Sequence, residues 1–203
     1  MIDRRRLANL IEVGLALVVA FSAGQLAART PSSPKPGAVD VGFTQDMAVH
    51  HEQAVLMANL AQSRGGPAVA ELADAILINQ SQEIGMMRGW LKLWGKPAAD
   101  PTPMAWMSLV PSTTMSMSMP GMASPDELTR LSTLGGKHFD VLFLQLMIRH
   151  HLGGLEMCQY ARDHAKLSVV RNAATAEAVE QIEDLGELQA LLKADGGVPI
   201  RQH

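Results

Sequence analysis

The chain has 203 residues, of which 47% are hydrophobic, 18% charged and only 4% aromatic, and its formal net charge is −3 at pH 7. This length and apolar content are enough for one domain with a buried core and exclude a disordered chain, and the negative charge disfavours nucleic acid as a partner. Because Ala, Leu and Met are frequent and β-branched runs are scarce, the composition predicts an all-α protein. The single cysteine, Cys158, excludes an intrachain disulfide, so stability has to come from the core or from a bound metal.

The first 28 residues have the pattern of an export signal. Three arginines, residues 4–6, precede the apolar stretch 7–28, which is interrupted only by Glu12 and ends in small residues. We expect residues 1–28 to be either a cleaved signal peptide or an uncleaved membrane anchor, because the stretch is long enough to cover a bilayer. A buried cytosolic helix fits less well, because the arginines lie at one end and a Pro/Ser linker, residues 29–40, follows at the other. The sequence thus predicts an exported, periplasmic or extracytoplasmic protein that contacts the membrane only through this segment.

Helical periodicity begins after the linker and defines a domain over residues 41–195. Apolar residues recur at intervals of three and four, and the runs are separated by Gly and Pro residues. The expected helices are 41–63, 67–94, 124–134, 137–164 and 168–194. A Met-rich connection, residues 98–123, joins the two halves. The loops within each half are short, so the two long helices of each half are expected to be antiparallel neighbours.

The two halves are related by an internal repeat. At an offset of 100 residues, five residues of the first long helix recur in the third: Phe43, Met47, His50, His51 and Met57 match Phe143, Met147, His150, His151 and Met157. At an offset of 101, three further positions carry the same or a similar residue: Gln80, Glu83 and Ile84 match Gln181, Asp184 and Leu185. Two repeated helical hairpins that close on one another predict a four-helix bundle.

The repeated Met and His residues are candidate metal ligands. On a helix they share one stripe about 120° wide, so both imidazoles and both thioethers of each repeat can meet one ion. A single stripe of this kind is usually core packing with hydrogen-bonded histidines. Its repetition favours metal binding, because four buried imidazoles are costly without compensation.

The residue types indicate which metal is expected. The chain contains no Glu-x-x-His motif, the motif of the di-iron bundles. Thioether together with imidazole favours copper, especially Cu(I), and zinc is a less favoured alternative. Four methionines also lie in a polar part of the Met-rich connection: Met115, Met117, Met119 and Met122. They either fold back over the bundle as an apolar lid or capture Cu(I).

Other polar residues have weaker claims to the site. Four mid-helix residues are candidates to orient the imidazoles as hydrogen-bond acceptors, although ordinary solvated positions would explain them equally: Gln80, Glu83, Gln181 and Asp184. Cys158 fits a small buried apolar residue better than a thiolate ligand. The remaining histidines are expected to be peripheral: His138, His164 and His203.

Several segments carry a resemblance to a known family. They are "FTQDMAVHHEQAVLMANLA", "INQSQEIGMMRGWLKLWG", "MPGM" followed by "SPDEL", and "FDVLFLQLMIRHHLGGLEMCQYA". With them the sequence resembles, over about residues 43–192, the ferritin-like bacterial domain family of unknown function numbered 305. The resemblance implies a ferritin-like four-helix bundle, usually exported, with copper binding in some members. It points to these residues as metal ligands: Met47, His50, His51, Met57, Met147, His150, His151, Met157, Met119 and Met122.

The combined interpretation is an exported protein that binds copper, as Cu(I) and also as Cu(II) through its histidines, for buffering, tolerance or transfer to a copper-transfer protein. No nucleophile or acid/base pair is evident in the sequence, so catalysis is not expected. Two alternatives remain. One is a non-catalytic structural or interaction bundle whose histidines only form hydrogen bonds. The other, less favoured, is a copper-dependent redox enzyme, which would need an open coordination position.

Overall fold

The computed structural model describes residues 35–107 and 119–200. Within these ranges the chain forms five α-helices, one short 3₁₀ turn and no β-strand. The helices are α2 (Ala38–Arg64), α3 (Pro67–Leu93), α4 (Pro125–Thr133), α5 (Gly136–His164) and α6 (Ser168–Ala194), and the 3₁₀ turn η1 is Ala105–Met107. The all-α prediction is confirmed, and each expected helix is present with ends within three residues of those predicted.

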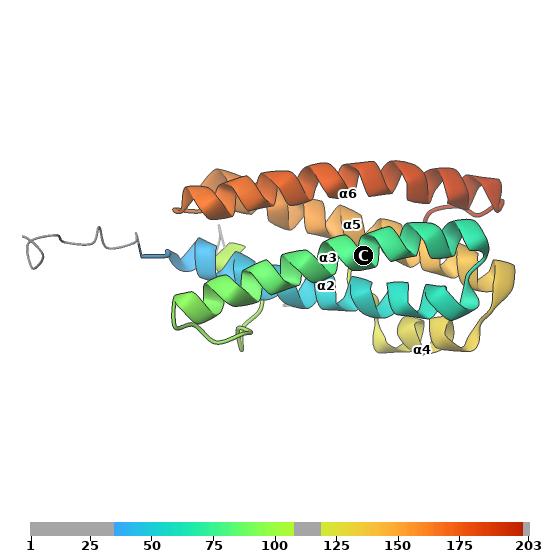
Figure 1. Cartoon of the computed structure of the whole chain (residues 1–203), viewed down its shortest axis with the longest axis horizontal. Coiled ribbons are helices and arrows are strands. Elements are labelled where there is room, and N and C mark those ends of the chain that lie inside the picture. The colour runs from blue at the N-terminus through green and yellow to red at the C-terminus, as the bar shows by residue number, and fades with distance from the viewer. Residues whose placement is uncertain (1–34, 108–118, 201–203) are drawn as a thin grey trace, which may run out of the picture. The chain divides into compact units, whose positions relative to one another are not determined.

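The four long helices α2, α3, α5 and α6 form a bundle (Figure 1). α2 packs along α3, and α5 packs along α6, so both predicted hairpins are formed. The hairpins join mainly through α2 and α5, whereas α3 and α6 touch over a smaller part of their length. The short helix α4 packs against α2 and α5. The two repeated hairpins therefore close into a four-helix bundle in which α2 and α5 form the central pair.

The predicted export segment, residues 1–28, lies outside the described residues. The predicted linker, residues 29–40, is described only from residue 35 onward, and α2 already begins at Ala38. Asp40 fixes this start, because its Oδ2 accepts the N–H of Gly37 at 2.6 Å. Among the helices of the described ranges, none is both long and apolar enough to span a membrane.

The starts of α3 and α4 follow from their first residues. Pro67 and Pro125 stand at the first position of these helices, where a missing N–H removes no intrahelical hydrogen bond. Before α4, the Ser124 hydroxyl accepts the Glu127 N–H at 3.3 Å, and the Glu127 carboxylate accepts the Ser124 N–H at 2.8 Å. This reciprocal capping box satisfies two N–H groups that the helix itself leaves unpaired.

Two aspartates at equivalent positions of the repeat fasten each hairpin to the other. Oδ1 of Asp40 in α2 accepts the N–H of Leu167, the N-cap residue of α6, at 2.8 Å. Oδ1 of Asp140 in α5 accepts the N–H of Gly66, the N-cap residue of α3, at 2.9 Å. Each carboxylate therefore lies at the positive end of a helix from the opposite hairpin, where negative charge is stabilising. The exchange fixes the register of the two hairpins.

The interior contains two apolar clusters with a histidine layer between them. One cluster contains Met47 and Met157, and the other contains Met57 and Met147. This pairing shows that α2 and α5 are antiparallel. The histidine layer consists of the side chains that fall between these methionines along the two helices, all at most 1% exposed: His50, His51, His150 and His151.

The η1 turn closes the cluster that contains Met47. Trp106 packs edge-on against Phe43, with ring centroids 5.8 Å apart, and its Nε1 donates to Oδ2 of Asp46 at 2.7 Å. The indole lies directly on Gly42, where any Cβ would overlap the ring. The part of the Met-rich connection before residue 108 is thus packed on α2.

We expect Asp140→Ala to destabilise the protein by about 1.5–3 kcal/mol, because the Gly66 N–H loses a charged acceptor and α3 loses the carboxylate at its positive end. Urea unfolding of the metal-free protein measures the difference. Glu187→Ala, at an exposed position of α6, is the matched control and should change the free energy of unfolding by less than about 0.5 kcal/mol. Equal stability of the two variants would contradict the exchange of caps.

Candidate metal centre

The middle of the histidine layer is a stacked pair of imidazoles, His50 from α2 and His150 from α5. Their ring centroids lie 3.7 Å apart, with an interplanar angle of 30°. Nε2 of His50 lies 3.0 Å from the carbonyl oxygen of Pro120, and Nε2 of His150 lies 2.9 Å from the carbonyl oxygen of His50. A carbonyl oxygen can only accept, so Nε2 carries the hydrogen in both rings and, in a neutral ring, Nδ1 carries the lone pair. Nδ1 of His50 is buried and has no hydrogen-bond partner within the described residues.

Burial keeps both rings of this pair uncharged. Loss of water, and next the neighbouring His51, lowers the pKa of His50 to about 3. The pKa of His150 is lowered well below its usual value, again by loss of water first and by His50 second. Both rings are therefore neutral at pH 7, and neutral imidazole is the form that binds a metal ion.

The four helix methionines predicted as ligands are completely buried on the two sides of the stacked pair. Each is 0% exposed: Met47, Met57, Met147 and Met157. Because α2 and α5 are antiparallel, the methionine that precedes the histidines on one helix shares an apolar cluster with the methionine that follows them on the other. Thioethers from both repeats therefore lie on either side of the imidazoles.

The outer histidines, His51 and His151, contact carboxylates of α3 and α6. Nε2 of His51 lies 2.8 Å from Oε2 of Glu83, and Nε2 of His151 lies 3.1 Å from Oδ2 of Asp184. Glu83 and Asp184, two of the four residues expected to orient the imidazoles, thus contact them. Nδ1 of His151 also lies 3.1 Å from the carbonyl oxygen of Met147. Both nitrogens of His151 thus face oxygen atoms, which holds the ring in one orientation between α5 and α6.

The other two residues of that set, Gln80 and Gln181, are buried, and within the described residues neither forms a hydrogen bond with an imidazole. Nε2 of Gln181 lies 3.9 Å from Sγ of Cys158, and this Sγ lies 3.8 Å from Oε2 of Glu177. Burial, and next the Glu177 carboxylate, raises the pKa of the Cys158 thiol well above its usual value. Cys158 is therefore a protonated, buried thiol, as expected for a structural cysteine.

Residues 119–122, the MPGM sequence, run across the histidine layer, and we call this segment the strap. It passes so close to α5 that a Cβ on Gly153 would overlap the carbonyl group of Pro120. A Cβ on Gly121 would overlap the carbonyl oxygen of Arg149, and Gly121 has φ +77°, a conformation that favours glycine. The strap holds two predicted ligands, Met119 and Met122, in partly buried positions. Met115 and Met117, the other two methionines of this polar stretch of the sequence, lie outside the described residues.

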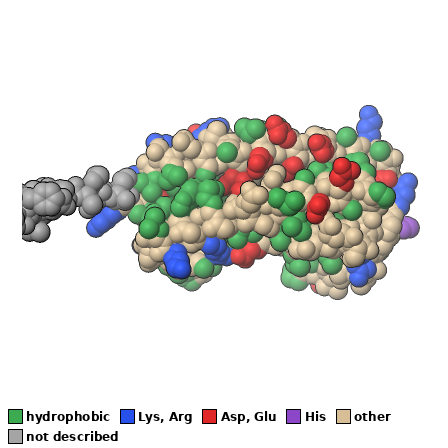
Figure 2. All heavy atoms as spheres, in the orientation of Figure 1, with side chains coloured by type: hydrophobic (Ala, Val, Ile, Leu, Met, Phe, Trp, Pro, Cys, Tyr) green, Lys and Arg blue, Asp and Glu red, His purple; other side chains and the backbone are tan. Residues whose placement is uncertain are grey.

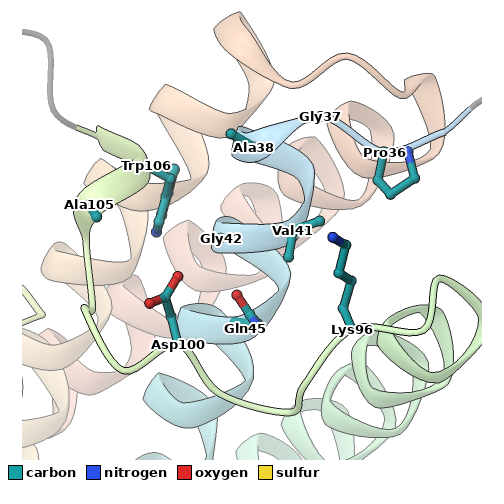
Figure 3. A pocket seen from close by; sticks show the side chains of 10 residues that line it. All are labelled: Pro36, Gly37, Ala38, Val41, Gly42, Gln45, Lys96, Asp100, Ala105 and Trp106. Carbon is teal, nitrogen blue, oxygen red and sulfur yellow. The ribbon is translucent and has the colours of Figure 1, made fainter.

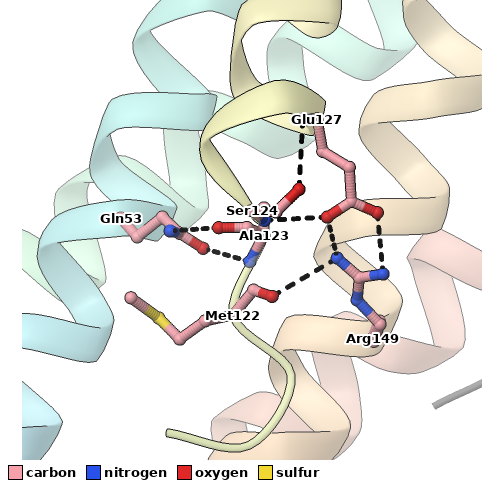
Figure 4. A network of polar contacts seen from close by, with 6 residues as sticks. All are labelled: Gln53, Met122, Ala123, Ser124, Glu127 and Arg149. Atoms are coloured by element: carbon pink, nitrogen blue, oxygen red, sulfur yellow. Dashed lines mark hydrogen bonds and ion pairs between the residues drawn. The ribbon is translucent and has the colours of Figure 1, made fainter. Parts of the chain in front are cut away.

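A polar network fastens the end of the strap to α2 and α5 (Figure 4). Gln53 of α2 accepts the Ala123 N–H at 2.6 Å and donates to the Ala123 carbonyl at 3.0 Å. Arg149 of α5, which is 6% exposed, donates to the Met122 carbonyl at 3.3 Å and to both carboxylate oxygens of Glu127 at 2.9 and 2.6 Å. The Arg149 guanidinium lowers the pKa of Glu127 to about 2. This charge-assisted, bidentate pair holds the strap in place.

Acidic side chains gather along the line where α3 and α6 meet (Figure 2). We call four acidic residues of these two helices the acidic seam: Glu83 from α3, and Glu177, Glu180 and Asp184 from α6. Loss of water raises the pKa of Glu83 to about 7 and that of Glu180 to about 7. Glu177 is 1% exposed, and loss of water followed by the Glu83 charge raises its pKa to about 8. In the part of the chain that the structure describes, the ion pairs of the seam are made with His51 and His151 and not with Lys or Arg.

Sequence reasoning did not find Glu177 and Glu180. The signal was present in α6, whose buried positions form one helical series: Val170, Ala174, Glu177, Gln181, Leu185, Leu188 and Leu192. Glu177 and Gln181 thus occupy core positions of an otherwise apolar stripe. A charged side chain at such a position is uncommon without a partner and marks a polar site inside the bundle.

The histidine layer is distinct from a pocket that lies at one end of α2. That pocket has a volume of about 380 Å³ and lies beside the start of α2, η1 and the loop after α3 (Figure 3). Its lining includes Gln45, Lys96, Asp100 and Trp106 but none of the predicted metal ligands. In residues 35–107 and 119–200, no group of three or more His, Cys, Asp and Glu side chains is arranged to hold a metal ion.

The fold and the site together define a class of protein: an all-α bundle of two repeated helical hairpins with histidines and methionines buried between them. The model of the DUF305 family, a domain of unknown function, matches residues 40–192. The chain belongs to this family, as the sequence resemblance indicated. None of the curated proteins matches the chain significantly.

Solved structures agree with this assignment. A DUF305 protein from Streptomyces coelicolor that is classed as secreted is 36% identical, with a TM-score of 0.74 over 81% of this chain and 97% of that chain. A DUF305 fragment from Deinococcus radiodurans is 30% identical, with a TM-score of 0.68 over 79% of this chain and 99% of that one. CopM in its Cu(II)-bound form is 22% identical, with a TM-score of 0.60 over 76% of this chain and 96% of that one, and shares the fold.

We expect Gly153→Ala to displace the strap and to destabilise the protein by about 1–3 kcal/mol, because the new methyl group overlaps main-chain atoms of Pro120. Gly89→Ala in α3 is the matched control, since a Cβ there meets nothing within 4 Å. It should stabilise the protein by up to about 1 kcal/mol through the higher helix propensity of alanine. Urea unfolding compares the two variants, and two stabilising substitutions would show that the strap does not rest on Gly153.

We expect the free energy of unfolding of the metal-free protein to fall as the pH is lowered from 4.5 to 3. Over this range His50 is protonated in the unfolded chain, with its ordinary pKa of 6.5, but not in the folded chain, with a pKa of about 3. The unfolded state therefore binds more protons, and acid favours it by about 1.4 kcal/mol per pH unit for each such imidazole. The raised pKa values of the acidic seam act in the opposite direction, but only above pH 4.5, the ordinary pKa of Glu.

The variant His50→Gln separates this effect from the rest of the protein. Glu127, whose pKa is lowered to about 2, also makes stability fall with acid, but it does so in both proteins. Urea unfolding at several pH values should give a slope that is smaller by about 1.4 kcal/mol per pH unit in the variant. Parallel slopes would mean that His50 is charged in the folded protein.

Proposed function

We propose that the protein is an exported copper-binding protein whose histidine layer holds Cu(I), and Cu(II) through its histidines, for copper buffering, tolerance or transfer. The observation that carries this proposal is the stacked pair of His50 and His150, in which each Nε2–H is tied to a main-chain carbonyl. Histidines that bind metal almost always donate their second nitrogen to a carbonyl, a carboxylate or water, which fixes the tautomer and aims the lone pair. The buried, unpartnered Nδ1 of His50 is such an aimed lone pair.

The chemistry of the surrounding side chains supports copper as the ion. The proposed ligands are the two Met-x-x-His-His motifs with their following methionines, and the two methionines of the strap: Met47, His50, His51, Met57, Met147, His150, His151, Met157, Met119 and Met122. Soft thioethers beside imidazoles favour Cu(I) over hard cations. An ion among these ligands also offsets the cost of burying an imidazole nitrogen that has no hydrogen-bond partner.

The strap has a specific role in this proposal. Met119 and Met122 flank Pro120, whose carbonyl accepts the His50 N–H, so the segment that carries two thioethers also holds the imidazole. Gln53 and Arg149 anchor the strap next to Met122 and leave Met119 at the end that continues into the Met-rich connection. We infer that Cu(I) passes from thioethers of this connection to the histidine layer by ligand exchange.

Two comparisons support the ion and the location. CopM, which shares the fold, has been solved with Cu(I), with Cu(II) and with Ag bound. The relative from Streptomyces coelicolor is classed as secreted, and residues 1–28 of this chain have the pattern of an export segment, whether cleaved or kept as an anchor. In this role the protein takes copper outside the cytoplasmic membrane and buffers it or passes it to a copper-transfer protein.

A titration of the purified full chain with Cu(I), in competition with a chelator of known affinity, tests the proposal. We expect tight binding that weakens by at least about 100-fold in the double variant His50→Ala/His150→Ala, because both aimed nitrogens are removed. The matched control is His138→Ala/His164→Ala, in which two exposed histidines are removed and Cu(I) affinity should be unchanged.

Folding has to be followed in the same samples by helical circular dichroism and thermal unfolding. If the His50/His150 variant stays helical and keeps the Cu(I) affinity of the control, the copper proposal is wrong. If it loses stability while the unmodified chain shows no Cu(I) binding, the histidines are structural and the protein is an interaction bundle.

A further inference from the structure

Three lysines gather at the end of the bundle where α2 begins. Lys96, in the loop after α3, lines the pocket beside the start of α2 together with Pro36 and Gly37 (Figure 3). A Cβ built on Gly37 would lie 3.5 Å from Cβ of Lys166, the residue between α5 and α6. Nζ of Lys166 also donates to the carbonyl oxygen of Lys35 at 2.9 Å. Three segments that are distant in the sequence thus meet here, and we call Lys35, Lys96 and Lys166 the basic end.

The lysines of the basic end are exposed, and no ion pair offsets their charge. Among the ion pairs of the described residues, none involves a lysine. The carboxylates nearby have other partners, since Asp40 and Asp100 accept main-chain N–H groups. Asp163 pairs with Arg162. The basic end is therefore a positive surface on a chain whose formal net charge is −3.

Apolar side chains are exposed next to these lysines in the sequence and at the same end of the bundle. Leu93, the last residue of α3, is 78% exposed, and Val169, in the first turn of α6, is 46% exposed. Trp90 and Trp94 stack on one another at the end of α3, with ring centroids 6.1 Å apart, and both indoles are partly exposed. Figure 2 shows hydrophobic and basic side chains side by side at this end. Lysine together with tryptophan and exposed aliphatic side chains is typical of surfaces that lie at a membrane interface.

The chain that precedes the basic end leads to the predicted export segment. Residues 29–34 separate that segment from Lys35, and seven residue steps span at most about 25 Å. If residues 1–28 are kept as an anchor, Lys35 therefore stays within about 25 Å of the membrane surface. If they are cleaved, the same exposed lysines and apolar side chains remain on the folded domain. In both cases this end is the one that follows the export segment in the chain.

We propose that the basic end docks on the anionic phospholipid surface of the membrane, with Leu93 and Val169 among the headgroups. Each lysine near such a surface strengthens binding about fivefold, and apolar side chains that enter the interface add to it. A second copy of the chain is a poorer occupant, because a two-fold interface would bring these lysines against themselves. The inference goes beyond the proposed copper binding and shares with it only the location outside the cytoplasmic membrane.

A polarity-sensitive dye attached to Leu93→Cys of the full chain tests the docking. Cys158 is completely buried, so the dye is directed to the new cysteine. Vesicles of phosphatidylcholine with phosphatidylglycerol should shift the dye emission to shorter wavelength, and vesicles of phosphatidylcholine alone should not. The same dye on Ile78→Cys, an exposed position about 22 Å away along α3, is the matched control and should not respond. Because the readout is local to residue 93, insertion of residues 1–28 into the bilayer does not by itself produce it.

Charge reversal tests the part that the lysines play. In the labelled chain, Lys35→Glu/Lys96→Glu/Lys166→Glu should lower the ratio of docked to free protein at least about 30-fold. Added salt should lower the same ratio in the unmodified chain, because it screens exposed charges. The matched control reverses three exposed cations at the opposite end of the bundle and should dock like the unmodified chain: Arg130→Glu, Lys137→Glu and Lys193→Glu.

Three results would overturn the docking proposal. They are no emission shift at residue 93, an equal shift with phosphatidylcholine alone, and an equal shift in the variant with the three lysines reversed. A shift without vesicles that grows with protein concentration would also overturn it, because a second copy would then cover this end. Helical circular dichroism checks that the variants fold, and Lys96→Glu alone carries the test should the triple variant unfold. Cu(I) affinity without vesicles should be the same in the triple variant and the unmodified chain, so failure of docking leaves the copper proposal standing.

Discussion

The stacking of His50 on His150 is the contact on which the rest of the structure depends. Two neutral imidazoles can be buried face to face only if each ring N–H finds an acceptor, because an unmade hydrogen bond in the interior is costly. One acceptor is the main chain of α2 itself, and the other is Pro120 of the strap. The strap therefore has to cross α5 at close range, and the missing Cβ atoms of Gly121 and Gly153 make this approach sterically feasible.

The repeat is kept where the outer histidines lie and broken where the inner ones stack. His51 with Glu83 and His151 with Asp184 are the same pairing in two copies of one hairpin. The inner rings are not equivalent, because Nε2 of His150 lies against the carbonyl of His50 on the opposite helix, whereas Nε2 of His50 lies against the carbonyl of Pro120. The strap, which lies between the two hairpins in the sequence, supplies this second acceptor.

The parts of the fold that depend on local pattern were predictable, and those that depend on main-chain atoms were not. The helical periodicity of apolar residues, with Gly and Pro between the runs, predicted all five helices. The internal repeat predicted the bundle and placed the histidines in its interior. A carbonyl group such as that of Pro120 has no sequence signature, and the partners of Asp40 and Asp140 lie more than 70 residues away. Glu177 was detectable, since it interrupts an apolar stripe, but its neighbour Glu180 becomes meaningful only beside Glu83 of another helix. Met104 and Met107 pack against an apolar cluster, whereas the two interpretations of the later methionines, an apolar lid or capture of Cu(I), stay predictions.

Charge differs across the bundle in a way that bears on the choice of ion. The layer between α2 and α5 offers neutral imidazoles and thioethers, so an ion bound there keeps its own charge and has to give up its water without anionic ligands. A monovalent soft ion meets this requirement more readily than a divalent one, whose dehydration is far more costly. The carboxyl groups of the acidic seam lie on another side of the bundle, and loss of water raises the pKa of Glu83 and Glu180 to about 7 and that of Glu177 to about 8. Imidazole binds many transition metals, so a preference of the histidine layer for a soft ion has to come from the thioethers that accompany the imidazoles.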